Sequence, residues 1–236
     1  MTASLFATTL PKSMLIDTGF TKPGSLLLER IIGEMMRRNN IDMTFHVLPA
    51  QRSLERVNSG YADGEAARIS TINKTYPNLI SVPESIFEID ILAVTKEKIP
   101  SINDLKDLKK FKVTALKGVE IIRRTMQIIQ AKKFIPSSTI KKMLEMLNSN
   151  KVDVILIERL GIFSHFEKFV HQDFYIHKKP LLKKRLYFHL HKKHKALLPI
   201  FLKTLQEMKK DGTFARINRS FFNDLTEKVS KIMNVL

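Results

Sequence analysis

A short, almost wholly aliphatic run restricts the fold of this chain more than any other feature of the sequence. Residues 152–157 read VDVILI, between a polar turn and a charged pair. A strand of this composition suits a parallel sheet that is covered on both faces. Apolar residues at helical spacing occupy Ser25–Met36 and Thr139–Leu147. Strands that alternate with such helices predict an α/β fold with mainly parallel sheets.

The remaining strands are predicted from local patterns. Ser4–Thr8 has the character of a short buried strand, and the residues from there to Gly24 are expected to form a loop. Leu79–Val82 and Ile89–Thr95 are expected to be two further strands, because each is a short apolar run next to turn residues. Both lie before the lysine-rich stretch that begins at Lys96.

The length of the chain allows two lobes. Its 236 residues suffice for one large core or two smaller ones. The stretch from Lys96 is typical of a connector into a second unit, and a strand near Leu186 would return from it. If the beginning and the end of the chain pack together, the middle forms a lobe of its own. We therefore expect lobe 1 to comprise residues 1–94 and 190–236 and lobe 2 to comprise residues 95–189, joined by two crossings.

Composition excludes several classes of site. The chain has no cysteine, so disulfides, thiolate catalysis and cysteine-ligated metal sites are excluded. No apolar run approaches the roughly 18 residues that a membrane-spanning helix needs. The first residues lack the basic and apolar regions of a secretory signal. A formal net charge of +17 favours anionic ligands or surfaces, without choosing among them.

Four stretches, in this order along the chain, resemble one known family. They are Leu48–Leu54 leading into Asn58–Gly64, Ser101–Leu108 followed by Lys117-Gly118, Leu147–Val154, and Met208–Ile217. Their order and spacing resemble family 3 of the bacterial extracellular solute-binding proteins, the group typified by polar amino-acid receptors of ABC transporters.

The resemblance implies a fold, a location and a partner. It implies the two-lobed type II periplasmic-binding-protein fold, in which helices flank a mainly parallel sheet in each lobe and hinge strands run near Ile91–Thr95 and Leu186–Leu190. It further implies a periplasmic location after removal of an export signal, a small-molecule ligand, the membrane permease of an ABC transporter as partner, and a monomer. No cofactor is expected.

One departure from the family pattern affects the ligand. Amino-acid-binding members usually carry a T-x-x-R motif beyond the Asp-bearing strand, and its arginine grips the ligand's α-carboxylate. The equivalent stretch here is Ser70–Thr75, which contains no arginine. Arg68, on the preceding strand, can perform a similar task from another direction.

Candidate ligand-binding residues lie where strands end, because ligands of α/β lobes gather at the carboxyl ends of the strands. Glu65 and Arg68 end the strand that begins near Asp63, and Glu158 ends the aliphatic strand beside Arg159. An arginine binds a carboxylate with two hydrogen bonds, whereas a glutamate suits an amine or a sugar hydroxyl. Both signs together suit a zwitterion. An internal ion pair between Glu65 and Arg68 is equally compatible with the sequence.

Two further candidates stand at the starts of helices. Gly118, Val119 and Glu120 form a strand-to-helix turn, and the family resemblance implies that the N-terminus of this helix faces the ligand. Arg52 begins another helix, where it can either bind ligand or tie the adjacent strand and loop together.

Other kinds of function are disfavoured. His189, His191 and His194 suggest a metal site, but Lys192 and Lys193 disfavour a cation there, so no metal is expected. The basic clusters lack a recognition helix or stacking aromatics, so nucleic acid is not expected as a partner. No nucleophile elbow or phosphate-binding glycine loop is present, so no catalytic residue is assigned.

The sequence thus predicts a non-enzymatic binding protein. It is expected to capture a small polar, carboxylate-bearing, amino-acid-like solute by hinge closure and to present it to an ABC transporter. Two alternatives stay open: a binding-protein fold converted to a lyase or dehydratase, with Glu65 or Glu158 as general acid or base, and a detached ligand-sensing domain of a signalling receptor.

Overall fold

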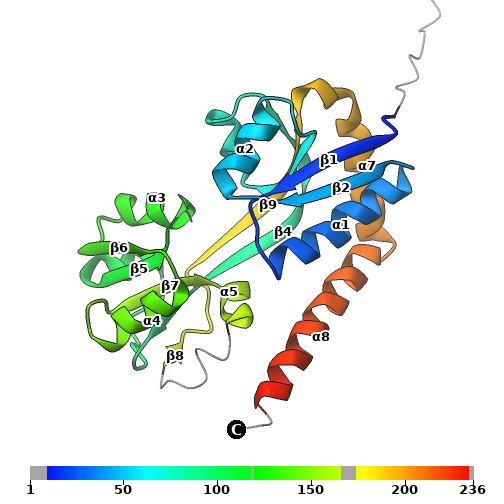
Figure 1. Ribbon diagram of the computed structural model, residues 1–236. Coiled ribbons are helices and arrows are strands. Elements are labelled where there is room, and N and C mark those ends of the chain that lie inside the picture. The colour runs from blue at the N-terminus through cyan, green and yellow to red at the C-terminus, as the bar shows by residue number, and fades with distance from the viewer. Residues whose placement is uncertain (1–9, 118–119, 166–173, 234–236) are drawn as a thin grey trace, which may run out of the picture. The chain divides into compact units, whose positions relative to one another are not determined.

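The structure, a computed structural model, describes residues 10–117, 120–165 and 174–233 (Figure 1). The chain divides into two compact units. Unit 1 comprises Met1–Glu88 and Arg185–Thr226, and unit 2 comprises Ile89–Lys184 and Glu227–Leu236. Each unit is an α/β assembly with helices packed on a sheet.

The first half of the chain, in order, contains β1 (Ser13–Thr18), α1 (Gly24–Arg38), β2 (Asp42–Val47), α2 (Ala50–Asn58), β3 (Gly64–Arg68), a 3-10 helix (Ser70–Lys74), β4 (Leu79–Thr95), a second 3-10 helix (Leu105–Lys110) and β5 (Lys112–Leu116). The second half contains α3 (Glu120–Ile128), β6 (Lys133–Ser137), α4 (Ile140–Asn148), β7 (Val154–Glu158), α5 (Arg159–Ser164), β8 (Tyr175–Ile176), β9 (Leu182–His191), a third 3-10 helix (Lys192–Leu197), α7 (Leu198–Lys210) and α8 (Thr213–Met233).

The sheet of unit 1 is mainly parallel. Its strands follow the order β2-β1-β3-β9, with β2 and β3 parallel to β1 and β9 antiparallel to β3. The crossovers β1-α1-β2 and β2-α2-β3 run in opposite directions along the sheet, so right-handed connections place α1 and α2 on opposite faces. Helix α1 buries its apolar stripe, which is formed by Leu27, Leu28, Ile31, Ile32, Met35 and Met36.

A separate hydrophobic core covers each face of the sheet of unit 2. Its strands follow the order β4-β7-β5-β6, with β5, β6 and β7 parallel and β4 antiparallel to β7. Side chains alternate between the faces of a strand. Accordingly, Ile155 and Ile157 pack with α4, whereas Val154 and Leu156 pack on the other face with residues of α3. The prediction that the aliphatic run is a strand covered on both faces is confirmed.

The prediction for the start of the chain was wrong. The segment expected to be a loop contains β1, and Ser4–Thr8, expected to be the first strand, lies outside the described residues. Strand β1 buries Met14 and Ile16, but Asp17 is buried as well. A charged residue at a buried position hid the strand pattern, so its local sequence resembled a loop.

Two other strands differ from expectation. Leu79–Val82 and Ile89–Thr95 belong to one continuous strand, β4, of 17 residues. No strand was expected at β6, which contains Pro136. Strand β6 stands at the edge of the sheet, where a proline that cannot donate a hydrogen bond is tolerated.

The chain passes between the units inside strands and a helix rather than loops. It leaves unit 1 after Glu88, within β4, returns at Arg185, within β9, and enters unit 2 again after Thr226, within α8. Strands β4 and β9 are hydrogen-bonded neighbours. The boundaries expected from the sequence, after residues 94 and 189, fall in the same two strands.

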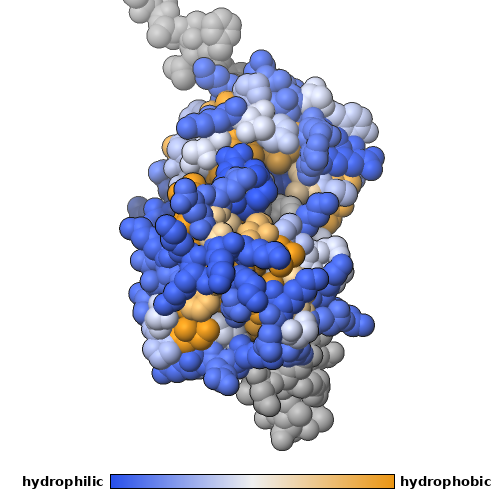
Figure 2. Space-filling model, turned by 90° about the vertical axis from the view of Figure 1, so that its left-hand side faces the viewer, coloured by the Kyte–Doolittle hydropathy of each residue, from blue (hydrophilic) through white to orange (hydrophobic). Residues whose placement is uncertain are grey.

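In the described parts of the chain, no helix combines the length and the apolar composition needed to cross a bilayer. The face drawn in Figure 2 is predominantly hydrophilic, and its apolar residues form separate spots.

Candidate functional site

Charged side chains are buried in unit 1 where β3 lies beside the carboxyl end of β1. Strands β1 and β3 are parallel neighbours, with Asp17 opposite Glu65. We call six residues the buried charge cluster: Asp17, Ser53, Arg56, Glu65, Arg68 and His189. Asp17, Ser53, Glu65 and His189 are fully buried. Buried charges are costly unless they are paired, so the partners of each group decide what the cluster can do.

Glu65 and Arg68 form an ion pair within unit 1. Nη2 of Arg68 lies 2.9 Å from Oε1 of Glu65. Glu65 also accepts hydrogen bonds from the hydroxyl of Ser53 and from the backbone N–H of Gly19. Nη2 of Arg68 donates to the carbonyl oxygen of Ala50 at 3.3 Å. The structure thus contains the internal pair that the sequence left open as an alternative to ligand binding.

Glu65 is poised to exchange a proton near neutral pH. Burial raises the pKa of Glu65 to about 7, against the lowering effects of Arg68, the Ser53 hydroxyl and the Gly19 N–H, and with a smaller raising effect from Asp17. Desolvation of the carboxylate is therefore the dominant influence.

His189 faces Glu65 from the neighbouring strand. The two residues are directly paired in the antiparallel register of β3 and β9. Nδ1 of His189 lies 2.8 Å from the carbonyl oxygen of Tyr187, and since a carbonyl can only accept, this nitrogen carries the proton. Burial lowers the pKa of His189 to about 4, so the ring is neutral at pH 7. Among the described residues, Nε2 has no hydrogen-bond partner.

Asp17 is held by an arginine from α2. Nε of Arg56 lies 2.6 Å from Oδ2 of Asp17, and the guanidinium stacks 4.2 Å from the centroid of the Tyr61 ring. Nδ1 of His46 lies 3.6 Å from the other oxygen, Oδ1. The pair joins the end of β1 to α2.

The surroundings of Arg68 combine close backbone contact with an aromatic ring. The guanidinium carbon of Arg68 lies 5.8 Å from the centroid of Phe20. A Cβ atom at Gly19 would lie 2.3 Å from Nη2 of Arg68 and 2.6 Å from Cα of Ala50. Only glycine fits there, because any side chain would displace the arginine. Arg68 keeps 15% of its side chain exposed, unlike Glu65.

The other predicted site residues lie elsewhere. Arg52, in the first turn of α2, is exposed and makes no polar side-chain contact with the described residues. The ion pair between β1 and α2 is made by Arg56 instead. Gly118 and Val119 lie outside the described residues, and Glu120 is the first residue of α3.

Glu158 is the last residue of β7 in unit 2. The neighbouring Arg159 pairs with Asp90, with Nη2 at 2.9 Å and Nε at 3.0 Å from Oδ2. Lys183 contributes a longer contact to Oδ1 of Asp90, at 3.7 Å.

Sequence reasoning missed Asp17, Ser53 and the role of His189. Asp17 stood in a segment expected to be a loop, and its position beside Glu65 follows only from the pairing of β1 with β3. His189 had been considered as a metal ligand. The described residues contain no cluster of His, Asp or Glu that could hold a metal ion, and His194 instead pairs with Asp63 at 2.7 Å.

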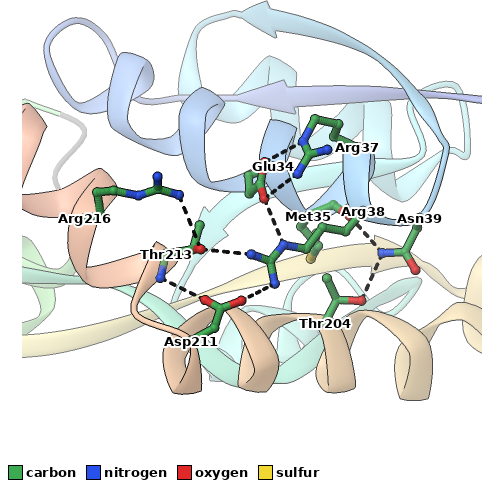
Figure 3. Close-up of polar contacts among 9 residues, drawn as sticks. All are labelled: Glu34, Met35, Arg37, Arg38, Asn39, Thr204, Asp211, Thr213 and Arg216. Atoms are coloured by element: carbon green, nitrogen blue, oxygen red, sulfur yellow. Dashed lines mark hydrogen bonds and ion pairs between the residues drawn. The ribbon is translucent and has the colours of Figure 1, made fainter.

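A cavity lies between α1 and α8, apart from the buried charge cluster. This cavity has a volume of about 500 Å³ and is lined by residues that include Glu29, Arg30, Glu34, Arg37 and Arg216. Most of its charges are paired within the protein, because Glu34 accepts from Arg37 at 2.7 Å and from Arg38 at 2.8 Å (Figure 3).

Arg38 continues this network into the turn between α7 and α8. Its guanidinium donates to Asp211 at 2.7 Å and to Thr213 at 2.9 Å (Figure 3). The network joins α1 to the end of the chain, and its internal pairing gives it a structural role.

Comparison with known proteins identifies the fold through structure alone. No protein-family model matches the chain, and no curated protein matches it. Among solved structures, an ancestral arginine-binding protein bound to glutamine is 18% identical, with a TM-score of 0.70 over 91% of this chain and 99% of that one. An amino-acid ABC transporter substrate-binding protein from Streptococcus pneumoniae, bound to L-arginine, is 15% identical, with a TM-score of 0.67 over 91% of this chain and 96% of that one.

The third similar structure is a domain of a signalling protein. It is a histidine kinase sensor domain with similarity to periplasmic binding proteins, 14% identical, with a TM-score of 0.72 over 89% of this chain and 96% of that one. At these identities the likeness establishes architecture rather than ligand. The chain has the two-lobed α/β fold of the type II periplasmic binding proteins, as found in extracellular solute-binding proteins of family 3.

Proposed function

We propose that this chain is a solute-binding protein whose ligand is a small polar, amino-acid-like molecule with a carboxylate group. The observation that carries the proposal is the Arg68–Glu65 pair on β3, which adjoins the carboxyl end of β1 and lies beside Phe20. Arginine is suited to a carboxylate, and an aromatic ring next to it offers an apolar surface to the rest of the ligand. Solved structures of the same fold bind amino acids, which supports this ligand class.

In this proposal, Arg68 is the group that contacts the ligand. Its partially exposed guanidinium forms its hydrogen bonds and ion pair through Nη2, and a carboxylate would compete with Glu65 for it. Glu65 then holds the arginine in place when no ligand is bound, and it cannot contact the ligand without becoming exposed.

We also propose that unit 2 takes part in ligand binding through hinge closure. Ligand held by unit 1 would favour a closed form to the extent that it binds that form more tightly than the open one. The segment Gly118–Glu120 and Glu158 are the proposed contributors from unit 2. Segments β4 and β9, through which the chain passes between the units, are the proposed hinges.

The proposed partner is the permease of an ABC transporter, with the protein located in the periplasm. The alternative of a ligand-sensing domain is favoured by one observation, the match to a histidine kinase sensor domain. The transport role and the sensing role use the same binding step and differ in the membrane protein that recognises the closed form.

The lyase alternative has weaker support. An acid-base role needs a carboxyl group with a raised pKa, which Glu65 has. However, Glu65 is fully buried and bonded to Ser53 and Arg68, so no substrate atom can reach it in this conformation. The solved structures of similar fold named above are binding proteins and a sensor domain.

The test is isothermal titration calorimetry with a panel of amino acids and small carboxylates, combined with mass spectrometry of the mixture. We expect one or more members to bind without being converted. The variant Arg68→Gln should lose at least tenfold in affinity, because a neutral amide replaces a charged bidentate donor. Arg219→Gln is the matched control: it removes the same charge from an exposed position on α8 in unit 1 and should leave affinity unchanged.

Three outcomes would contradict the proposal. Normal affinity in Arg68→Gln would remove Arg68 from the site. Conversion of a bound compound to product would favour the lyase alternative. Absence of binding across the panel would contradict the proposed ligand class. Because Arg68→Gln leaves Glu65 buried without its cation, the double variant Glu65→Gln/Arg68→Gln provides a folded reference that also lacks the guanidinium.

A further inference from the structure

Six lysines gather at the amino ends of the parallel strands of unit 2. We call them the lysine patch: Lys109, Lys110, Lys112, Lys132, Lys133 and Lys151. Lys112 and Lys133 are directly paired in the register of β5 and β6. The backbone N–H of Lys132 donates to the carbonyl of Lys109 at 2.8 Å. Nζ of Lys112 lies 3.4 Å from the carbonyl oxygen of Asn150, which precedes Lys151. These contacts hold segments from three parts of the chain together.

The lysines of the patch form no ion pair with the described residues of unit 2. Ion pairs between described residues of this unit use Lys141, Arg159 and Lys183, and none involves the lysine patch. Two acids near the patch are engaged by backbone groups: Asp153 accepts from the N–H of Lys112 at 2.7 Å, and Asp107 accepts from residues 103 and 104 while also attracting Lys110. Like charges that face each other across a sheet destabilise it, so this arrangement calls for an external anion.

The net charge of unit 2 also favours an anionic partner. Residues 89–184 contain twenty Lys and Arg against ten Asp and Glu, so this unit carries more than half of the +17 net charge. All members of the lysine patch except the half-buried Lys112 are exposed. An anionic surface would therefore meet unit 2 on this side with long, mobile ammonium groups.

An exposed apolar side chain stands next to the patch. Ile128, the last residue of α3, is 81% exposed, the highest value among the large apolar residues of the described chain. Its neighbours Met126 and Ile129 point into the core of unit 2. The N–H of Ala131 bonds back to the carbonyl of Met126 at 3.2 Å, and the chain continues directly into Lys132 and Lys133. The helix end thus holds Ile128 outward beside the lysines.

We propose that the lysine patch and Ile128 together form a docking surface for a bilayer rich in anionic phospholipid. The lysines would contact lipid phosphates, and Ile128 would enter the boundary between headgroups and acyl chains. Nucleic acid fits this surface less well. The described residues of unit 2 offer no highly exposed aromatic ring for stacking on bases, and an exposed isoleucine contributes nothing to phosphate binding.

The experiment is cosedimentation of the full chain with vesicles of phosphatidylcholine, with and without phosphatidylglycerol. We expect binding to the anionic vesicles alone, with an affinity that falls as salt rises. Each lysine near the surface contributes about fivefold to partitioning, so the triple variant Lys109→Gln/Lys132→Gln/Lys133→Gln should bind about 100-fold more weakly. Ile128→Ser should weaken vesicle binding without changing the net charge.

The matched control is Lys192→Gln/Lys195→Gln/Lys210→Gln, which removes three exposed lysines from unit 1. An equal loss in this control would show that net charge alone drives binding and would overturn the proposal. So would unchanged vesicle binding in Ile128→Ser, or binding of the wild type to double-stranded DNA in preference to anionic vesicles. None of these readouts depends on the ligand of unit 1.

Discussion

Glu65 and His189 should give folding stability two opposite dependences on pH. Both are fully buried and face each other across β3 and β9. The pKa of Glu65 is raised from 4.5 to about 7, and that of His189 is lowered from 6.5 to about 4. One pKa unit corresponds to about 1.4 kcal/mol, so each change amounts to about 3 kcal/mol of folding free energy.

The sign differs between the two groups. Between pH 4.5 and about 7, native Glu65 keeps a proton that the unfolded chain has lost, so its contribution is present at low pH and is lost as pH rises. Between pH 6.5 and about 4, the unfolded chain protonates His189 and the native state does not, so that contribution is lost as pH falls. In the wild type the two slopes oppose each other over pH 4.5–6.5.

The assay is urea unfolding of the wild type, Glu65→Gln and His189→Gln from pH 4 to pH 8. The free energy of unfolding of the wild type minus that of Glu65→Gln should fall by about 3 kcal/mol as pH rises from 4.5 to 7.5. The corresponding difference for His189→Gln should fall by about 3 kcal/mol as pH drops from 7 to 4. Curves for the two variants that stay parallel to the wild type across this range would refute the reasoning.

Two further predictions concern packing and the helix network. Gly19→Ala should destabilise the fold by about 1–3 kcal/mol, because its Cβ would meet Arg68 and the backbone of Ala50. Gly33→Ala, whose Cβ would lie 3.4 Å from Met43, should be neutral or stabilising. Chemical unfolding at pH 7 compares the two variants, and equal effects would contradict the close approach at Gly19. Arg38→Ala should lower Tm by about 2–4 °C, since it removes contacts to Glu34, Asp211 and Thr213. Arg37→Ala should change Tm less, because the side chain of Arg37 bonds to Glu34 alone among the described residues. Calorimetry measures both variants, and a larger effect of Arg37→Ala would be inconsistent with the network.

The sequence was sufficient to predict what local pattern determines. The run that forms β7 is aliphatic because both of its faces are covered, and the helices α1 and α4 show their buried stripes in the spacing of apolar residues. The same reasoning failed at β1, because Asp17 is a buried charge whose partner, Arg56, lies 39 residues away. It also failed at β6, where an edge position makes Pro136 acceptable.

The candidate site was predictable in part. Glu65 and Arg68 were identified because they are charges at the end of a strand, and their separation of three residues allows a pair. The contributions of Ser53, Gly19 and His189 depend on which strands and helices are neighbours. Those contacts join residues far apart in the chain, and a single sequence does not reveal them.

The order in which unit 1 is assembled follows from its discontinuity. Strand β3 pairs with β9, but β9 begins at Leu182, after most of unit 2 has been synthesised. Until then, Glu65 and Arg68 stand on an unpaired edge of a nascent sheet, whereas the larger segment of unit 2, Ile89–Lys184, is continuous and can begin to pack its own core. A chain that lacks Arg185–Thr226 would therefore keep β3 as an open edge, exposed to chaperones and proteases.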